Sequence, residues 1–195
     1  MKIRDAKDLY RTSIKDLREK RNEYLKKKEI LEKQARVDPY NGSDYEKDTA
    51  TINMTIDALD KEYEKAQGVL EQIINQEVSI ANAEVSKQQA DAMEKTAVDE
   101  AKVFETARRI AQGGKVPAKD ERKVMDYSME LYMASKNAAM LVKLQKNKKS
   151  KKYDSLWDDD EENPEYPDPM ETAGNSEFSG ATPEIASADS IVESM

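Results

Sequence analysis

The sequence predicts an all-α fold: an elongated antiparallel helical hairpin of coiled-coil type, a third helix that folds back on the distal half of a long central helix, and a disordered acidic C-terminal tail. Two observations carry this prediction. Apolar residues recur every seven positions along two long segments that contain no proline. The charged residues form blocks of alternating sign that coincide with the segment boundaries. We expect one helical domain over residues 1–152 and a tail over residues 153–195.

The first helix is predicted over residues 3–36, which contain neither glycine nor proline. Its heptad stripe consists of Ile3, Tyr10, Leu17, Tyr24 and Leu31. Charged residues, lysine and glutamate among them, fill most of the other positions, as on the solvent-facing side of a helix. Pro39 and the Asn41-Gly42 pair then favour a turn.

The second helix is predicted over residues 45–112, where proline is absent. Its heptad stripe consists of Ile52, Leu59, Ala66, Ile73 and Ile80. A polar patch at Gln88-Gln89 leaves two arrangements open. The helix either continues through the patch or bends there to form a compact bundle.

Charge supports the pairing of these two helices. Residues 1–37 carry a net charge of +6 and residues 44–112 a net charge of −7, so a basic helix lies on an acidic one. A short loop makes them antiparallel neighbours. The predicted pairs are Ile3/Ile80, Tyr10/Ile73, Leu17/Ala66, Tyr24/Leu59 and Leu31/Ile52. Apolar residues outside this seam predict burial against another chain, either a helical protein partner or a homo-oligomer with a dimer favoured.

A third helix is predicted over residues 118–146, because Gly113-Gly114 stops the second helix and Pro117 suits a helix start. We expect it to fold back on the half of the second helix that the first helix leaves unpaired. Methionines enrich it, and their flexible thioether side chains suit either the filling of a core or a surface that adapts to partner helices. The predicted docking residues are Met129, Leu131, Tyr132 and Met133.

The tail carries 13 acidic residues, no basic residue and four of the six prolines. Such a segment cannot bury enough apolar surface to offset its ordering entropy, so disorder is expected. Within it, an apolar pair beside a run of acidic residues is typical of a short docking motif. The predicted partner-binding residues of the tail are Ser155, Leu156, Trp157, Asp158, Asp159 and Asp160.

A lysine-rich segment, residues 143–152, precedes the tail. Phosphates of a nucleic acid or an anionic membrane surface would attract it. The acidic tail competes for the same lysines as an internal clamp, and few aromatic residues accompany them, so nucleic acid is not the expected partner. The basic patch consists of Lys143, Lys146, Lys148, Lys149, Lys151 and Lys152.

Composition excludes several classes of catalytic site. The chain has no histidine and no cysteine, which removes imidazole bases, Ser-His-Asp triads, thiolate nucleophiles and Cys-ligated zinc sites. The acidic run 158–162 lacks the alternating ligands and central glycine of an EF-hand loop. Gly113-Gly114-Lys115 lacks the spacing of a P-loop and follows a predicted helix rather than a strand. We therefore expect no enzyme activity, no cofactor and no metal.

The leading hypothesis is a non-enzymatic helical scaffold, adaptor or chaperone-like protein that acts through helix–helix docking and a tail motif. Two alternatives stay open: a substrate of a signal-less secretion system, and a binder of nucleic acid or an anionic membrane surface through residues 143–152. No apolar run is long enough for a transmembrane helix, and the start of the chain lacks a secretory signal. A cytoplasmic location is expected, with export without a classical signal peptide as the alternative.

Overall fold

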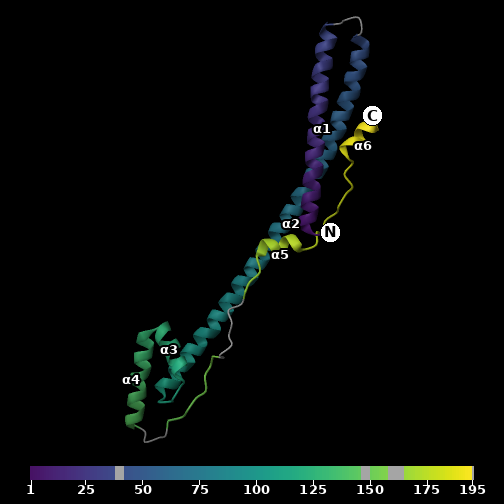
Figure 1. Cartoon of the computed structure of the whole chain (residues 1–195). Coiled ribbons are helices and arrows are strands. Elements are labelled where there is room, and N and C mark those ends of the chain that lie inside the picture. Colours follow the sequence, from purple (N-terminus) through teal and green to yellow (C-terminus); the bar gives the residue numbers. More distant parts are fainter. Residues whose placement is uncertain (38–41, 146–149, 158–164, 195) are drawn as a thin grey trace. The chain divides into compact units, whose positions relative to one another are not determined.

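The computed structural model describes residues 1–37, 42–145, 150–157 and 165–194. Over these residues, the regular secondary structure consists of the helices α1 to α6 (Figure 1). The predicted all-α fold is therefore confirmed.

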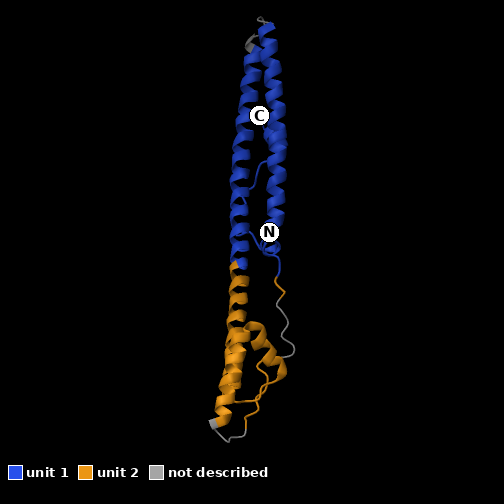
Figure 2. Ribbon diagram, turned by 90° about the vertical axis from the view of Figure 1, so that its left-hand side faces the viewer, with its two compact units in different colours: residues 1–85, 167–195 blue, residues 86–166 orange. Residues whose placement is uncertain are grey.

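The chain forms two compact units (Figure 2). Unit 1 contains Met1–Val85 and Pro167–Met195, and unit 2 contains Ser86–Tyr166. Helix α2 (Gly42–Ala111) contributes to both units, and its helical backbone continues through Gln88-Gln89, where the sequence left a bend open. The division differs from the sequence-based boundary after residue 152, because the described tail residues pack within these two units rather than forming a separate segment.

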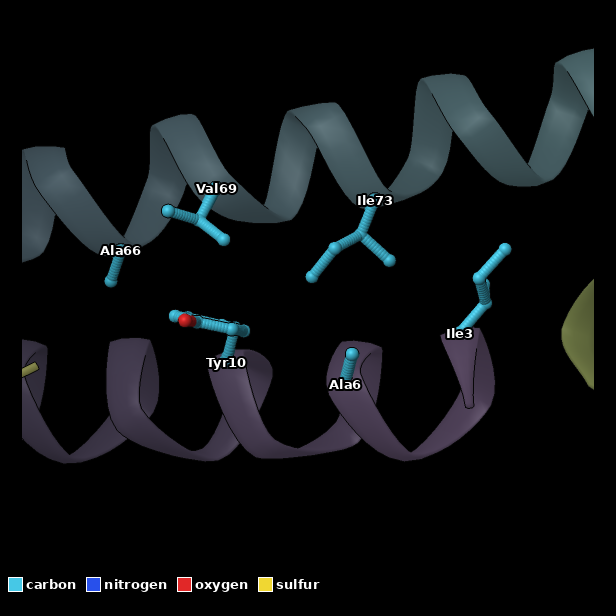
Figure 3. Packing of buried hydrophobic residues seen from close by; sticks show 6 residues of the cluster. All are labelled: Ile3, Ala6, Tyr10, Ala66, Val69 and Ile73. Carbon is cyan, nitrogen blue, oxygen red and sulfur yellow. The ribbon is translucent and has the colours of Figure 1, made fainter. Parts of the chain in front are cut away.

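Unit 1 is built on an antiparallel pair of α1 (Ile3–Val37) and the first part of α2 (Figure 1). Buried side chains from both helices point toward one another along this contact (Figure 3). They are Ile3, Ala6, Tyr10, Ala66, Val69 and Ile73. A second cluster contains Leu17 and Leu59. The predicted hairpin is thus present, and its core combines residues from the two heptad stripes.

Two ion pairs cross the same pair of helices. Lys7 Nζ lies 2.5 Å from Glu77 Oε1, and Arg21 Nε lies 2.5 Å from Asp60 Oδ1. The Lys7 and Glu77 side chains are only 18% and 8% exposed. In both pairs a basic residue of α1 meets an acidic residue of α2, as the charge blocks predict.

The described C-terminal residues are ordered, and for them the structure corrects the predicted disordered tail. Helix α5 (Pro169–Asn175) begins at Asp168, whose side chain accepts two hydrogen bonds from backbone N–H groups of the first turn. Helix α6 (Ala188–Glu193) begins at Ser187, whose side chain accepts one such bond. Both helices therefore start at residue types that cap helices well.

A few apolar side chains hold this C-terminal segment on unit 1. Phe178 and Ile185 pack against the first cluster, and Ile191 is buried within the second cluster. The Tyr10 hydroxyl donates a hydrogen bond to the Pro183 carbonyl oxygen at 3.0 Å. The segment is held in place by contacts of these side chains with the helix pair, and average composition does not reveal such contacts.

Unit 2 packs α3 (Ala118–Tyr127) and α4 (Met129–Gln145) with the last part of α2. The structure thus corrects the single helix predicted over residues 118–146. Ser128 separates the two helices with an extended backbone (φ −160°, ψ 114°). Its Oγ accepts the backbone N–H of Leu131 at 3.2 Å, so the same residue caps the start of α4.

Helix α2 ends at the predicted glycine pair. Gly113 has a φ of +80°, a left-handed conformation that favours glycine after a helix. A Cβ atom on Gly114 would lie 2.5 Å from the Tyr153 ring. This close approach lets the chain that follows α4 lie against the end of α2.

Candidate functional site

Residues 151–157 cross unit 2 as a segment without helical structure. The Lys115 N–H donates to the Lys151 carbonyl oxygen at 2.8 Å, and the Tyr153 N–H donates to the Lys115 carbonyl oxygen at 2.9 Å. The Arg109 guanidinium carbon lies 4.7 Å from the centroid of the Tyr153 ring, a cation–π contact. The chain is therefore anchored just before the predicted docking motif.

The buried carboxylate of Asp120, on α3, holds this motif. Asp120 is 1% exposed. Ser155 Oγ donates to its Oδ1 at 2.7 Å, and the Leu156 backbone N–H donates to its Oδ2 at 3.1 Å. Lys119 Nζ donates to the Trp157 carbonyl oxygen at 3.0 Å. Both carboxylate oxygens thus accept a hydrogen bond, as a buried charge requires.

The Trp157 side chain is part of the core of unit 2 and is 7% exposed. The buried members of its cluster are Val103, Ala107, Val124 and Trp157. Leu131, Tyr132 and Leu156 pack against this cluster. Trp157 therefore joins α2, α3 and α4 in one core, and segment 151–157 is an integral part of unit 2.

The predicted tail motif thus lies on its own chain. Ser155, Leu156 and Trp157 are brought together there, whereas Asp158, Asp159 and Asp160 lie outside the described residues. Binding of this motif to another protein stays a prediction. Such binding would first have to break the hydrogen bonds to Asp120 and withdraw Trp157 from the core.

The side of α4 that faces away from this core is apolar and exposed. Its large side chains, between 54% and 76% exposed, are Met129, Met133, Met140, Leu141 and Leu144, and we call them the α4 outer face. On the inner side, Ser135 and Ala139 are buried. A surface helix normally has one apolar side, so the second apolar side of α4 is unusual for a helix that already packs in a core.

The docking surface predicted on the third helix is divided by the structure. Met129 and Met133 belong to the α4 outer face, whereas Leu131 and Tyr132 pack into the Trp157 cluster. With 3.6 residues per turn, position 131 points away from 129 and 133, and position 132 lies on the flank between the two sides. Sequence reasoning did not place Met140, Leu141, Leu144 or Asp120 in the site. For the first three, a signal was available in their helical spacing from Met133.

The described lysines of the predicted basic patch are exposed. Lys143 lies near the end of α4, and Lys151 and Lys152 lie on segment 151–157. Lys151 Nζ is 4.9 Å from the centroid of the Tyr153 ring. Lys146, Lys148 and Lys149 lie outside the described residues. Binding of nucleic acid or an anionic membrane through this patch therefore stays a prediction.

Two arginines near the end of α2 hold the Glu105 carboxylate. Arg108 Nε lies 2.7 Å from Oε2, and Arg109 Nε lies 2.9 Å from Oε1. The hydrogen bond from Arg108 and then that from Arg109 lower the pKa of Glu105 from 4.5 to about 2. We expect an NMR titration of the side-chain carboxyl groups in the folded protein to place the Glu105 midpoint near pH 2.

The ion pairs of Glu105 with Arg108 and Arg109 make the stability of the fold depend on pH. Because the pKa of Glu105 is lower in the folded state, the interaction stabilises the fold above about pH 4.5 and is lost as the pH falls toward 2. In a variant with Arg108→Gln and Arg109→Gln, the midpoint should return to the ordinary range of a glutamate. A midpoint that stays low in this variant would show that the arginines are not the cause.

No protein-family model matches the sequence, and no curated protein and no solved structure matches it either. Among the described residues, no helix combines the length and the apolar character needed to cross a bilayer. In the same part of the chain, no group of three acidic, histidine or cysteine side chains is arranged to hold a metal ion. Two features of unit 2 are candidates for a functional role: the segment that Asp120 holds through Ser155 and Leu156, and the α4 outer face.

Proposed function

We propose that the protein is a non-enzymatic helical scaffold or adaptor that binds a partner helix through the α4 outer face. The observation that carries the proposal is the apolar character of α4 on both sides. Its inner side packs in unit 2, while five large apolar side chains on the outer face stay exposed. Burying each of them would contribute roughly 1–2 kcal/mol. A contiguous exposed patch of this kind is typical of an interaction surface.

The folded state of unit 2 supports this interpretation. Trp157 and Leu156 complete the core, and Asp120 binds the segment that carries them. The hydrophobic core of unit 2 is therefore already complete, and the α4 outer face is not an unfilled part of that core. Figure 1 shows α4 along the edge of this unit, where a partner can reach it.

The spacing on this face suits a helical partner. Met133, Met140 and Leu144 follow one another at intervals of seven and four residues, which places them on one side of the helix. Methionine side chains adapt their shape to different apolar neighbours. The same face would therefore also serve a chaperone-like role toward several apolar helices.

Site-specific photo-crosslinking in the organism that encodes the protein tests the proposal. A photoreactive side chain is placed at Met140 in the full chain. We expect a covalent adduct with one defined protein, and we expect that adduct to disappear when Met133→Glu is added. A charge in the middle of the apolar face would have to be desolvated on docking, which explains the expected loss.

The matched control is Met93→Glu, the same substitution at another exposed methionine of unit 2. It should leave the adduct unchanged, and circular dichroism should show the same helix content in both variants. Absence of an adduct, or an adduct that survives Met133→Glu, would overturn the proposed docking surface.

A further inference from the structure

We infer that the partner of the α4 outer face is a second copy of this chain, with the two α4 helices parallel. The inference rests on the proposed function and specifies the partner. Three features of α4 support it: the heptad frame, the charges that border the face, and the area that pairing would bury.

One heptad frame fits both the sequence and the burial of α4. In this frame Met133 and Met140 occupy position d, and Asn137 and Leu144 occupy position a. All four are exposed. Ser135 and Ala139, at positions f and c on the opposite side, are among the buried residues. The unpaired side of α4 is thus the side that a coiled-coil partner would contact.

Asn137 is the polar residue in the middle of this seam, and Glu130, in the exposed first turn of α4, is the other polar residue at position a. A single asparagine at position a specifies register and oligomeric state in coiled coils, at a cost in stability. In a parallel pair it faces its own counterpart, so the two amides can form hydrogen bonds with each other. In an antiparallel pair position a faces position d, and the amide would be buried against methionine without a partner.

The bordering lysines favour the same orientation. Lys136 and Lys143 occupy position g. In an antiparallel pair, equal flanks meet, and Lys136 of one copy would face Lys143 of the other. In a parallel pair, position g faces position e, so Lys136 lies beside Leu141 of the second copy. Lys136 is also held within its own chain, with Nζ 2.9 Å from Glu121 Oε1, so its charge is paired before association.

The area of the face suits a weak dimer. Burying a large apolar side chain removes on the order of 100 Å² of apolar surface from water. Five such side chains give roughly 500 Å² per copy, or about 1,000 Å² in the pair, at the lower limit for a specific interface. We therefore expect reversible association with a Kd in the micromolar range rather than an obligate dimer.

Analytical ultracentrifugation of the full chain measures this association. Between about 1 µM and about 300 µM, the mass should rise from the monomer value of 22.2 kDa toward twice that value. The double variant Met133→Glu, Met140→Glu should raise Kd by at least about 100-fold. Met93→Glu should associate like the natural chain. A monomer at every concentration, or a dimer that the double variant retains, would overturn the inference.

A disulfide test measures the orientation, because the natural chain has no cysteine. Leu144→Cys lies near one end of α4 and meets its counterpart only if the helices are parallel. Under mild oxidation we expect a covalent dimer from Leu144→Cys and none from the control Met93→Cys. A mixture of Met133→Cys and Leu144→Cys chains that yields mainly the mixed disulfide would show the antiparallel arrangement and overturn the parallel one.

The ultracentrifugation and the photo-crosslinking together separate this inference from the proposed function. If the chain stays monomeric while Met140 crosslinks to a different protein and Met133→Glu abolishes that adduct, self-pairing is wrong and the docking function holds. If neither association nor an adduct is found, the docking function fails as well.

Discussion

Replacing Trp157 with alanine is expected to lower the free energy of unfolding by about 3–5 kcal/mol. The side chain is 7% exposed and joins residues of α2, α3 and α4 in one cluster, so its removal leaves a large cavity. Urea unfolding followed by circular dichroism measures the change. Trp157→Phe should lose less, because the phenyl ring fills part of the same space.

The control for this prediction is Met93→Ala, a truncation of a 74% exposed side chain in the same unit. It should change the free energy of unfolding by no more than about 0.5 kcal/mol. If Trp157→Ala costs no more than Met93→Ala, segment 151–157 does not hold unit 2 together. The tail motif would then be free to bind partners, as the sequence alone suggests.

Trp157 fluorescence gives an independent check, because the chain has one tryptophan. In the folded protein its emission should be that of a buried indole and should move to longer wavelength on unfolding. A motif presented freely to partners would instead show the emission of an exposed indole from the start. The same signal would report any partner that withdraws Trp157 from the core.

The helical hairpin could be predicted because it depends on local sequence. The heptad stripes of residues 3–36 and 45–112, the turn signal between them and their opposite charges all indicate the same arrangement. The same apolar spacing repeats in each heptad, so every further heptad strengthens the prediction of paired helices. The ends of α1 and α2 follow from the same signals, at Val37 and Ala111.

The C-terminal segment could not be predicted in this way. Phe178, Ile185 and Ile191 are too far apart in the sequence to form a periodic pattern. They pack against residues of α1 and α2 that lie more than 100 positions earlier in the chain. The role of Asp120 could not be predicted for the same reason, since its partners Ser155 and Leu156 lie more than 30 residues later in the sequence. Composition describes such segments as acidic and polar, although a few side chains decide whether they fold.

Binding by the predicted docking residues stays a prediction, and the structure shows only how each of them is placed on the helix. Met129 and Met133 lie on the exposed face, because methionine enrichment pointed to the correct helix. Leu131 and Tyr132 were predicted on the same docking surface, whereas the structure packs them against the Trp157 cluster. Helical spacing groups the exposed residues of α4 on one side, but the burial of the opposite side depends on segment 151–157, which follows the helix in the sequence.

Replacing Lys7 with alanine is expected to lower the free energy of unfolding by about 3 kcal/mol. The change leaves the Glu77 carboxylate, with its side chain only 8% exposed, without the ammonium group that now lies 2.5 Å away. An unpaired buried charge costs more than the pair contributes, because the carboxylate cannot regain its hydration. Urea unfolding of the full chain measures the loss.

The exposed pair of Lys15 and Glu19 provides the matched control on the same helix. Its side chains are 73% and 65% exposed and 3.9 Å apart, so Lys15→Ala should cost no more than about 0.5 kcal/mol. The double variant Lys7→Met, Glu77→Leu should recover most of the loss, because it replaces both charges with apolar groups of similar size.

A small effect of Lys7→Ala would have a specific structural meaning: another cation would have to compensate Glu77. Arg4 is the candidate, because its guanidinium lies near Glu77 beside Gly174. Arg4 Nε and Glu77 Oε1 are each 3.8 Å from the position that a Cβ atom on Gly174 would occupy. Adding Arg4→Ala to Lys7→Ala would then cost far more than the sum of the single variants. If the effects are merely additive, Lys7 is the cation that compensates Glu77, and Arg4 does not contribute to that compensation.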